Sequence, residues 1–304
     1  MILVADSGST KTDWVLKPEY SSPDASGPTL IHTQGINPIH MADAQILTIL
    51  RDELLSALPP HLSSLTIAFY GSGVRADQEE RMERLLREAF SPLIAQGALP
   101  PVSTEGDARP VQESALLHVE AHSDLLGAAR ALCGDREGLA CILGTGANSC
   151  LYDGQHIVAN TPPLGYILGD EGSGAVLGKR FLNALYKGRL SRETQDAFET
   201  TVQATLTEVI DRVYRQPMAN RWLASLSPFI HSRLADPAVE QLAVDNFSDF
   251  ISRNIDPYHR HDLPLQAVGS IAYHYREQLC KAATKAGYAV GNILRSPLDN
   301  QNWK

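Results

Sequence analysis

A polar stretch of eight residues lies between two short apolar runs near the start of the chain: Asp6-Ser7-Gly8-Ser9-Thr10-Lys11-Thr12-Asp13. The apolar runs, residues 2–5 and 14–16, predict two strands that are joined by a tight turn. Gly8 and its small neighbours can bring backbone N–H groups close to an anion. Lys11 adds a positive charge, and Asp6 can hold a hydrated magnesium ion. The alternative is an ordinary polar hairpin turn, but the density of Asp, Gly, Thr and Lys favours phosphate binding.

The composition is that of a soluble globular protein. The chain has 304 residues, of which 43% are hydrophobic and 20% are charged, and this length suits two domains of ordinary size. Its 26 basic and 35 acidic side chains give a formal net charge of −9. Because Lys and Arg are not in excess and the acidic residues are spread out, we expect neither a nucleic-acid partner nor an anionic membrane.

The four cysteines form no metal-binding pattern in the sequence. They are Cys133, Cys141, Cys150 and Cys280. None belongs to a C-x-x-C pair or a histidine-rich cluster, so zinc and iron–sulfur sites have little support, and we expect reduced, buried thiols. The apolar run before Asp6 is too short for a signal peptide or a membrane span, so a cytoplasmic location is expected.

The first half of the chain alternates between strand and helix patterns. A strand is expected at residues 30–33, a helix at 42–58, a strand at 65–70 and a helix at 78–94. Asn37, in the loop Gly35-Ile36-Asn37-Pro38, either binds a sugar hydroxyl or amide or is a plain turn residue. Gly71 opens a Gly-Ser-Gly loop that either approaches a ligand or simply turns. We place the end of the first domain near Leu117.

A strand at 116–119 and a helix at 125–132 lie on either side of His122-Ser123-Asp124. Asp124 is therefore expected at or near a helix N-terminus. An N-cap is the simplest role for a carboxylate at that place, and a catalytic role needs support from the rest of the chain.

A second strand–turn–strand pattern follows about one domain after the first. A strand at 138–143 leads into Gly144-Thr145-Gly146-Ala147-Asn148-Ser149, and another strand is expected at 150–152. One Gly-Thr-Gly turn is a weak signal. Because it echoes the stretch that begins at Asp6, the pair suggests a duplicated architecture in which each half offers one phosphate-binding turn.

Two more glycine-flanked turns occur in the second half. Asp170 and Glu171 precede a helix expected at 175–186, and this pair either caps the helix or accepts hydrogen bonds from ligand hydroxyls. Gly269-Ser270 is either a simple turn or a nucleotide contact between a strand and a helix. The remaining expected elements are helices over 192–253 with breaks at three prolines and no recognisable chemistry, a strand at 265–268, a helix at 271–285 and a last strand at 288–294.

Six of these motifs, in their shared order and spacing, resemble the BadF/BadG/BcrA/BcrD ATPase and N-acetylglucosamine kinase group of the actin-like, sugar-kinase superfamily. The resemblance covers nearly the whole chain. The motifs are residues 6–13, 35–38, 123–124, 144–149, 169–173 and 268–270.

The resemblance implies an α/β chain of two duplicated ribonuclease H-like domains, 1–117 and 118–304, the second with a helical insertion, with ATP and Mg²⁺ in a cleft between the domains. It implies that Asp124 is the general base for a sugar 6-hydroxyl and that Asp6 binds the metal. The implied nucleotide-binding residues are Ser7, Gly8, Ser9, Thr10, Lys11, Gly144, Thr145, Gly146, Gly269 and Ser270. The implied sugar-binding residues are Asn37, Gly71, Thr145, Asn148, Gly165, Asp170 and Glu171.

The expected function is that of an ATP-dependent amino-sugar kinase, with N-acetylglucosamine as the favoured acceptor. N-acetylmuramic acid or its 1,6-anhydro form stays open, since a modest pocket change would admit it. Two other functions also stay open. One is an ATP- or sugar-responsive regulator, which would need no base. The other is an ATPase that activates a partner enzyme, which the cysteine pattern disfavours. The oligomeric state is also open, although a dimer is common in similar proteins. The short C-terminus lacks the expected long final helix, which leaves open whether the tail, about 291–304, packs on the first domain.

Overall fold

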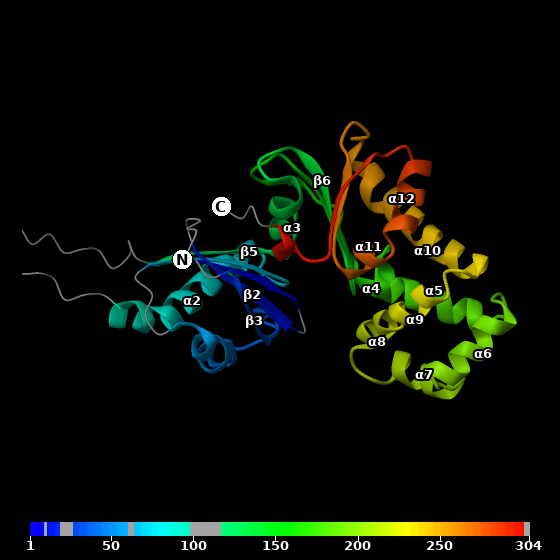
Figure 1. Ribbon diagram of the computed structural model, residues 1–304, viewed down its shortest axis with the longest axis horizontal. Coiled ribbons are helices and arrows are strands. Elements are labelled where there is room, and N and C mark those ends of the chain that lie inside the picture. The colour runs from blue at the N-terminus through cyan, green and yellow to red at the C-terminus, as the bar shows by residue number, and fades with distance from the viewer. Residues whose placement is uncertain (9–10, 19–26, 60–63, 98–116, 301–304) are drawn as a thin grey trace, which may run out of the picture. The chain divides into compact units, whose positions relative to one another are not determined.

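The computed structural model describes residues 1–8, 11–18, 27–59, 64–97 and 117–300, so Ser9 and Thr10 lie outside the described residues. The chain divides into two compact units, Met1–Gly127 and Ala128–Lys304 (Figure 1). The first unit extends beyond the boundary expected near Leu117, because strand β5 (Leu117–Ser123) pairs with β4 (Leu65–Gly71) of the first sheet.

The first unit is built on a five-stranded sheet, sheet A, with the order β3-β2-β1-β4-β5. β1 (Ile2–Ser7) and β2 (Lys11–Lys17) form the antiparallel hairpin that the polar stretch predicts, and β3 (Thr29–Gln34) extends it. β4 and β5 run parallel to β1. The carboxyl ends of β1, β3, β4 and β5 therefore meet at one edge of the sheet, together with the β1–β2 turn.

Helices pack on one face of sheet A and complete its core. The helix expected over 42–58 is present, but its winding changes along its length: α1 (Asp43–Thr48), a π turn η1 (Ile49–Leu54) and a 3₁₀ turn η2 (Leu55–Ala57). The second expected helix is α2 (Ala76–Gly97). In the core, the rings of Trp14 and Phe69 lie 5.6 Å apart. The buried indole N–H of Trp14 donates to Thr33 Oγ1 at 3.0 Å, so this polar group is satisfied.

The second unit repeats the topology of the first. Its sheet, sheet B, has the order β10-β9-β6-β7-β8. Read from β8, it matches sheet A read from β3: two antiparallel pairings are followed by two parallel ones. The duplicated α/β architecture is thus confirmed, although β8 is too short to predict. The strands are β6 (Gly138–Leu143), β7 (Ala147–Tyr152), β8 (Ile157–Ala159), β9 (Leu265–Val268) and β10 (Val290–Leu294).

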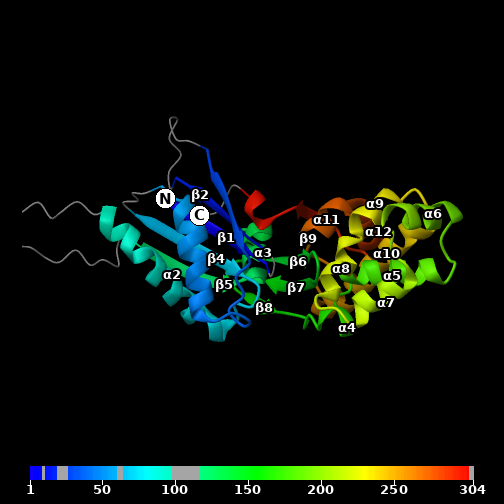
Figure 2. The ribbon, with the colours of Figure 1, turned by 90° about the horizontal axis from the view of Figure 1, so that it is seen from below.

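Helices form the rest of the second unit, and α5 to α9 lie beyond one end of the strands of sheet B in both views (Figures 1 and 2). The helices are α4 (Gly165–Leu168), α5 (Gly174–Tyr186), α6 (Arg192–Thr201), α7 (Leu206–Tyr214), α8 (Ala219–Ser225), α9 (Ser227–Ser232), α10 (Pro237–Phe250), α11 (Ser270–His274) and α12 (Arg276–Lys285). The short turns are η4 (Ile251–Ile255), η5 (Asp256–Tyr258) and η6 (Pro297–Asp299). Helix α3 (Asp124–Cys133) begins in the first unit and ends in the second.

The helix expected over 271–285 is two helices instead of one. The backbone of Tyr275 leaves the helical region (φ −102°, ψ 28°), and its hydroxyl donates to the carbonyl oxygen of Ser227 at 2.5 Å. This part-buried hydrogen bond ties the break between α11 and α12 to the start of α9.

Three of the four cysteines are buried, as expected, and Cys280 is half-buried. All four are free thiols. Burial raises the pKa of Cys133 to about 11 and that of Cys150 to about 12, so both thiols are poor nucleophiles. Within the described ranges, no helix combines the length and the apolar character needed to cross a bilayer.

The C-terminal segment packs on α3. The Asn292 side chain donates to the carbonyl oxygen of Leu132 at 3.1 Å, and the Asn300 side chain donates to that of Ala131 at 2.6 Å. Both carbonyls belong to the last turn of α3. The described part of the tail is therefore held within the second unit, whereas the sequence left open a position on the first domain.

Gly178 marks the closest approach of two helices in the second unit. A Cβ atom placed on Gly178 of α5 would lie 2.2 Å from the carbonyl oxygen of Leu223 and 2.8 Å from its carbonyl carbon, on α8. These are backbone atoms, so only a shift of one helix against the other could relieve the overlap.

We expect Gly178→Ala to lower the free energy of unfolding by about 1–3 kcal/mol, the usual scale for overpacking a core. The better helix propensity of Ala offsets at most about 1 kcal/mol of this. Denaturant unfolding measures the change. Gly27→Ala is the matched control, because a Cβ there meets nothing within 4 Å. Wild-type stability of Gly178→Ala would contradict the close packing of α5 on α8.

Candidate functional site

The predicted residues of the first unit gather at the carboxyl edge of sheet A. Each one lies at the end of a strand, in the β1–β2 turn or at the start of α3. They are Asp6, Ser7, Gly8, Lys11, Asn37, Gly71 and Asp124. In open sheets with parallel strands, ligands bind at the carboxyl ends of the strands, so this edge is the place where a ligand is expected.

Asp6 lies in a crowded group of carboxylates. Burial, followed by the negative charges of Asp124 and Asp13, raises the pKa of Asp6 to about 7, and Lys11 opposes the shift. Asp13 accepts hydrogen bonds from Lys11 Nζ at 2.6 Å and pairs with His32 Nδ1 at 2.6 Å. Asp6 therefore lies beside two other carboxylates, and a cation placed beside it would relieve the repulsion.

The Ser7 side chain has a structural role. It is fully buried, lies 2.7 Å from Thr12 Oγ1, donates to the carbonyl oxygen of Ile36 and accepts from the Ile36 N–H. These bonds fix the loop that carries Asn37 to the end of β1. The Gly8 N–H donates to the carbonyl oxygen of Lys11 at 3.0 Å, which closes the hairpin turn. The Ser7 hydroxyl is thus committed to the fold.

Asp124 is the first residue of α3, but a neighbour caps the helix. Ser123 Oγ accepts from the Leu126 N–H at 3.2 Å, the bond expected of an N-cap residue. Ser123 is therefore the N-cap residue, and Asp124 is the first residue inside the helix, where its carboxylate accepts from the Leu125 N–H. Burial raises the pKa of Asp124, and the N–H groups of Leu125 and of Asp124 itself oppose the shift. A carboxylate with a raised pKa, at the same edge as Asp6, suits a general base.

The Asn37 side chain stabilises a turn with its oxygen, while its NH₂ group has no partner among the described residues. Its Oδ1 accepts from the Ile39 N–H at 3.0 Å, and no hydrogen-bond partner is found for its Nδ2 among the described residues. Its side chain lies against Gly73, where a Cβ would come within 2.3 Å of Asn37 Oδ1 and where φ is +87°. Gly71 is buried, and a Cβ on it would lie 2.6 Å from Phe69 Cε1, so close packing requires a glycine here.

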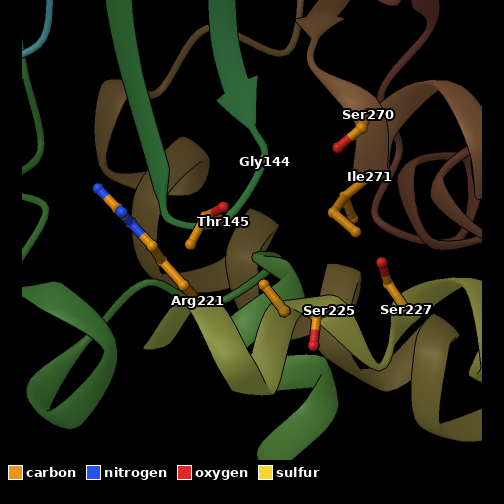
Figure 3. Close-up of a pocket in the computed structure, with 8 residues that line it drawn as sticks. Gly144, Thr145, Arg221, Ser225, Ser227, Ser270 and Ile271 are labelled. Atoms are coloured by element: carbon orange, nitrogen blue, oxygen red, sulfur yellow. The ribbon is translucent and has the colours of Figure 1, made fainter. Parts of the chain in front are cut away.

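In the second unit, a cavity of about 250 Å³ joins three of the predicted residues, Gly144, Thr145 and Ser270 (Figure 3). Figure 3 shows the Ser270 and Ser227 hydroxyls turned toward the space that faces the Gly144–Thr145 turn. The Ser225 hydroxyl instead donates to the carbonyl oxygen of Trp222 at 2.7 Å. The full lining is Gly144, Thr145, Arg221, Ala224, Ser225, Ser227, Ser270 and Ile271.

The far wall of this cavity is formed by residues that the sequence does not predict to bind a ligand. Arg221 on α8 and Ser227 on α9 come from the helical region in which we recognised no chemistry. The Arg221 side chain extends alongside the Thr145 turn (Figure 3). Arg and Ser are ordinary residues of exposed helices, so nothing in the sequence distinguishes them before the fold brings them to the turn.

The two glycine turns at this cavity are held tightly. Gly269 has φ +120°, and a Cβ on it would lie 2.4 Å from the carbonyl oxygen of Leu143. The start of α5 holds the other turn, because the Gly174 N–H donates to Gly144 O at 2.8 Å and the Ala175 N–H donates to Thr145 O at 3.2 Å. Gly269 therefore serves close backbone packing at the end of β6, and Ser270 is the residue of this pair that faces the cavity.

Asp170 lies over the Gly144–Gly146 turn. It has a left-handed backbone conformation (φ 54°), and a Cβ on Gly146 would come within 3.1 Å of Asp170 Oδ2. Burial raises the pKa of Asp170, and a hydrogen bond from the Ala147 N–H opposes this shift. Ser173 caps α5 by accepting from the Val176 N–H at 3.1 Å, so a capping role for Asp170 and Glu171 is wrong.

The other residues predicted to bind the sugar are partly occupied by protein contacts. Glu171 accepts from Arg253 at 2.9 Å and from Asn254 at 3.3 Å. Asn148 Oδ1 accepts from the Ser149 N–H and from Asn160 Nδ2, both at 2.9 Å. Gly165, at the start of α4, has φ +76°, and a Cβ atom placed on it would have no other atom within 4 Å. Of Asn148, Asp170 and Glu171, Asp170 thus has the fewest side-chain partners in the protein.

Similar structures place this architecture in a family. No protein-family model matches the sequence, and no curated protein matches it. A structure of a candidate N-acetylglucosamine kinase from Porphyromonas gingivalis is 43% identical over 99% of this chain and 96% of that chain, with a TM-score of 0.83. A candidate N-acetylglucosamine kinase from Chromobacterium violaceum, at 18% identity over 95% and 94% of the two chains and a TM-score of 0.64, shares the fold. Given the identity to the Porphyromonas gingivalis protein over nearly the whole of both chains, this protein belongs to the N-acetylglucosamine kinase-like family of sugar kinases with the actin-like fold.

Proposed function

We propose that this protein is an ATP-dependent kinase that phosphorylates the 6-hydroxyl of an amino sugar, with N-acetylglucosamine as the acceptor. The observation that carries the proposal is Asp124: a carboxylate with a raised pKa, relieved of helix capping by Ser123, at the same sheet edge as Asp6. The 43% identity to a candidate N-acetylglucosamine kinase supports the acceptor. The motifs also support membership of the BadF/BadG/BcrA/BcrD group.

The nucleotide is proposed to use both glycine turns. The adenosine part would enter the cavity lined by Thr145, Ser227 and Ser270, whose hydroxyls and backbone groups can bind a ribose or a base. The β- and γ-phosphates would lie against the β1–β2 turn. Lys11 supports this placement, because its side chain is 66% exposed at that turn. Phosphate oxygens would then replace Asp13 as its partner.

Mg²⁺ fits the surroundings of Asp6. Among the residues with described positions, no group of three or more His, Cys, Asp or Glu side chains forms a complete metal site. Magnesium in kinases needs no such group, because one or two carboxylates, waters and the substrate phosphates complete its shell. Burial and the negative charges of Asp124 and Asp13 raise the pKa of Asp6, and a cation would relieve the repulsion between these charges. When bound, the ion would neutralise charge on the phosphates.

The remaining residues position the acceptor and move its proton. Asp124 would accept the proton of the sugar hydroxyl as that oxygen attacks the γ-phosphorus. The Nδ2 group of Asn37 would donate to a sugar oxygen, and the Asp170 carboxylate would accept from sugar hydroxyls. Phosphoryl transfer depends mainly on such positioning and on charge neutralisation.

A panel of sugars with ATP and Mg²⁺, with ADP release measured for each, tests the proposal. N-acetylglucosamine should give the highest kcat/KM. A preference for N-acetylmuramic acid would change the acceptor and leave the kinase reaction intact. Sugar binding without ADP release would favour a regulator, and sugar-independent ATP hydrolysis would favour an ATPase that activates a partner enzyme.

The Asp170→Asn variant tests the sugar contact. Asn tolerates the left-handed backbone of this position, so the turn should be kept. A charge-assisted hydrogen bond contributes about 1.5–3 kcal/mol and a neutral one about 0.5–1.5 kcal/mol, so the sugar KM should rise about tenfold while the ATP KM changes little. Steady-state kinetics in both substrates measures this.

Asp153→Asn is the matched control for this variant. Asp153 also accepts backbone N–H groups in a turn of the second unit, from Gln155 and His156 at 2.8 and 2.7 Å, and it is exposed. Its sugar KM should equal that of the wild type. An unchanged sugar KM in Asp170→Asn would remove Asp170 from the proposed pocket.

A further inference from the structure

The last turn of α3 has an unusual set of hydrogen-bond partners. An α-helix leaves its last four carbonyl oxygens without partners inside the helix. In α3 two of these oxygens are met by the following backbone: the Gly134 N–H donates to Arg130 O at 3.0 Å, and the Arg136 N–H donates to Cys133 O at 3.2 Å. The other two are met by side-chain amides from distant parts of the chain, Asn300 on Ala131 O and Asn292 on Leu132 O.

These amides belong to a small network that joins α3 to sheet B. Asn292 Nδ2 also donates to Gln266 Oε1 at 3.1 Å, and Gln266 Nε2 donates to Cys133 Sγ at 3.0 Å. Gln266 is 6% exposed on β9, and Asn292 lies on β10. We call Gln266, Asn292 and Asn300 the α3 latch. Each member contributes a side-chain amide, and two of them bind carbonyl oxygens that an ordinary helix end leaves to water.

Close contacts hold two points beside the latch, although cavities of about 250 and 540 Å³ also border it. A Cβ on Gly138 would lie 2.6 Å from Cys133 Sγ, and a Cβ on Gly291 would lie 2.8 Å from Gln266 Cγ. The other half of α3 is also held closely, because a Cβ on Gly127 would lie 2.6 Å from Tyr70 Cγ. A short helix that is fixed so tightly responds to a change at one end as a unit.

We propose that the α3 latch is a positioning element for Asp124. This inference rests on the proposed function, in which Asp124 is the general base. Ala131, the residue that Asn300 binds, lies seven positions after Asp124, which is about 10 Å along a helix that rises 1.5 Å per residue. Releasing the last turn lets the helix shift along its axis, and Asp124 moves with it. Asn292 and Asn300 thus act on the reaction through α3, without touching the substrates.

The test uses Asn300→Asp and Asn292→Asp, which keep the side-chain shape but lose the N–H donors. The new carboxylate also meets the negative end of the helix dipole. We expect kcat to fall about tenfold, since a misplacement of about 1 Å can cost as much as a hundredfold. The ATP KM should stay within about twofold of the wild-type value, because neither residue lines the nucleotide cavity. Asn300→Gln, which keeps the donor, should restore part of the lost kcat.

Gln195→Glu is the matched control for the isosteric changes. The Gln195 side chain also donates to a backbone carbonyl, that of Leu190 at 2.8 Å, but at the start of α6. Its kcat should be that of the wild type even if its melting temperature falls. If Asn300→Asp and Asn292→Asp also keep the wild-type kcat while only their melting temperatures fall, the latch has a structural role alone and the proposal is wrong.

A second readout does not depend on activity. Hydrogen exchange of the backbone amides of residues 125–128 should be faster in Asn300→Asp than in the wild type, and unchanged in Gln195→Glu. Unchanged exchange in Asn300→Asp would overturn the proposal. If the wild-type protein phosphorylates no sugar, the proposed function fails, and the exchange rates still decide whether the latch holds the first turn of α3.

Discussion

The Asp124→Asn variant is expected to bind ATP nearly as well as the wild-type protein and to phosphorylate the sugar about a hundredfold more slowly, or worse, which is the scale for losing a general base. Asn keeps the size and shape of the side chain but does not accept the proton of the sugar hydroxyl. Because Ser123 caps α3, the helix should keep its N-terminal hydrogen bond in the variant. Single-turnover phosphorylation measures the chemical step, and titration calorimetry measures the affinity for ATP.

The Ser123→Ala variant distinguishes helix capping from catalysis at the start of α3. Loss of an N-cap typically costs about 1 kcal/mol of stability. We therefore expect Ser123→Ala to lower the melting temperature, whereas Asp124→Asn should leave it close to the wild-type value. A normal phosphorylation rate in Asp124→Asn would exclude Asp124 as the base, whatever the melting temperatures.

The fold follows from features that are local in the sequence. The stretch from Asp6 to Asp13 predicts the β1–β2 hairpin, and the Gly144–Ser149 stretch predicts its counterpart, because each combines a tight glycine turn with two apolar runs. Their repetition predicts the duplicated sheets. β4 pairs in parallel with β1, and β9 pairs in parallel with β6, so in each unit the carboxyl ends of these strands lie at the same edge of the sheet.

The details that failed depend on tertiary contacts. Asp124 and Asp170 have the composition of helix caps, yet Ser123 and Ser173 make the capping bonds, since either neighbour of a helix start can supply the oxygen. The helical residues 192–253 gave no chemical signal, because Arg221 becomes part of a cavity only when α8 packs on α5. The buried hydrogen bonds of the Ser7 hydroxyl with Ile36 are likewise visible only in the fold.

Asp6→Asn is expected to raise the Mg²⁺ concentration needed for half-maximal phosphorylation by about tenfold to a hundredfold, since even residues that only support a metal ligand cost this much when they are changed. The variant should at the same time be as stable as the wild-type protein or more so without metal. Asp6 lies beside Asp124 and Asp13, and its ionised form is disfavoured by burial and by their negative charges. A neutral amide of the same shape removes that repulsion.

The two effects together distinguish a metal ligand from a structural carboxylate. If the Asp6 carboxylate stabilises the fold, neutralising it lowers the stability of the protein. If it serves to bind a cation, its charge destabilises the protein until the cation is bound. Asp52→Asn, which removes an exposed charge from η1, controls for the change in net charge and should alter neither quantity. Thermal unfolding without Mg²⁺, and phosphorylation rates over a Mg²⁺ series, measure the pair. A variant that is destabilised and has an unchanged Mg²⁺ requirement would assign Asp6 to the fold and would move the metal site away from the β1–β2 turn.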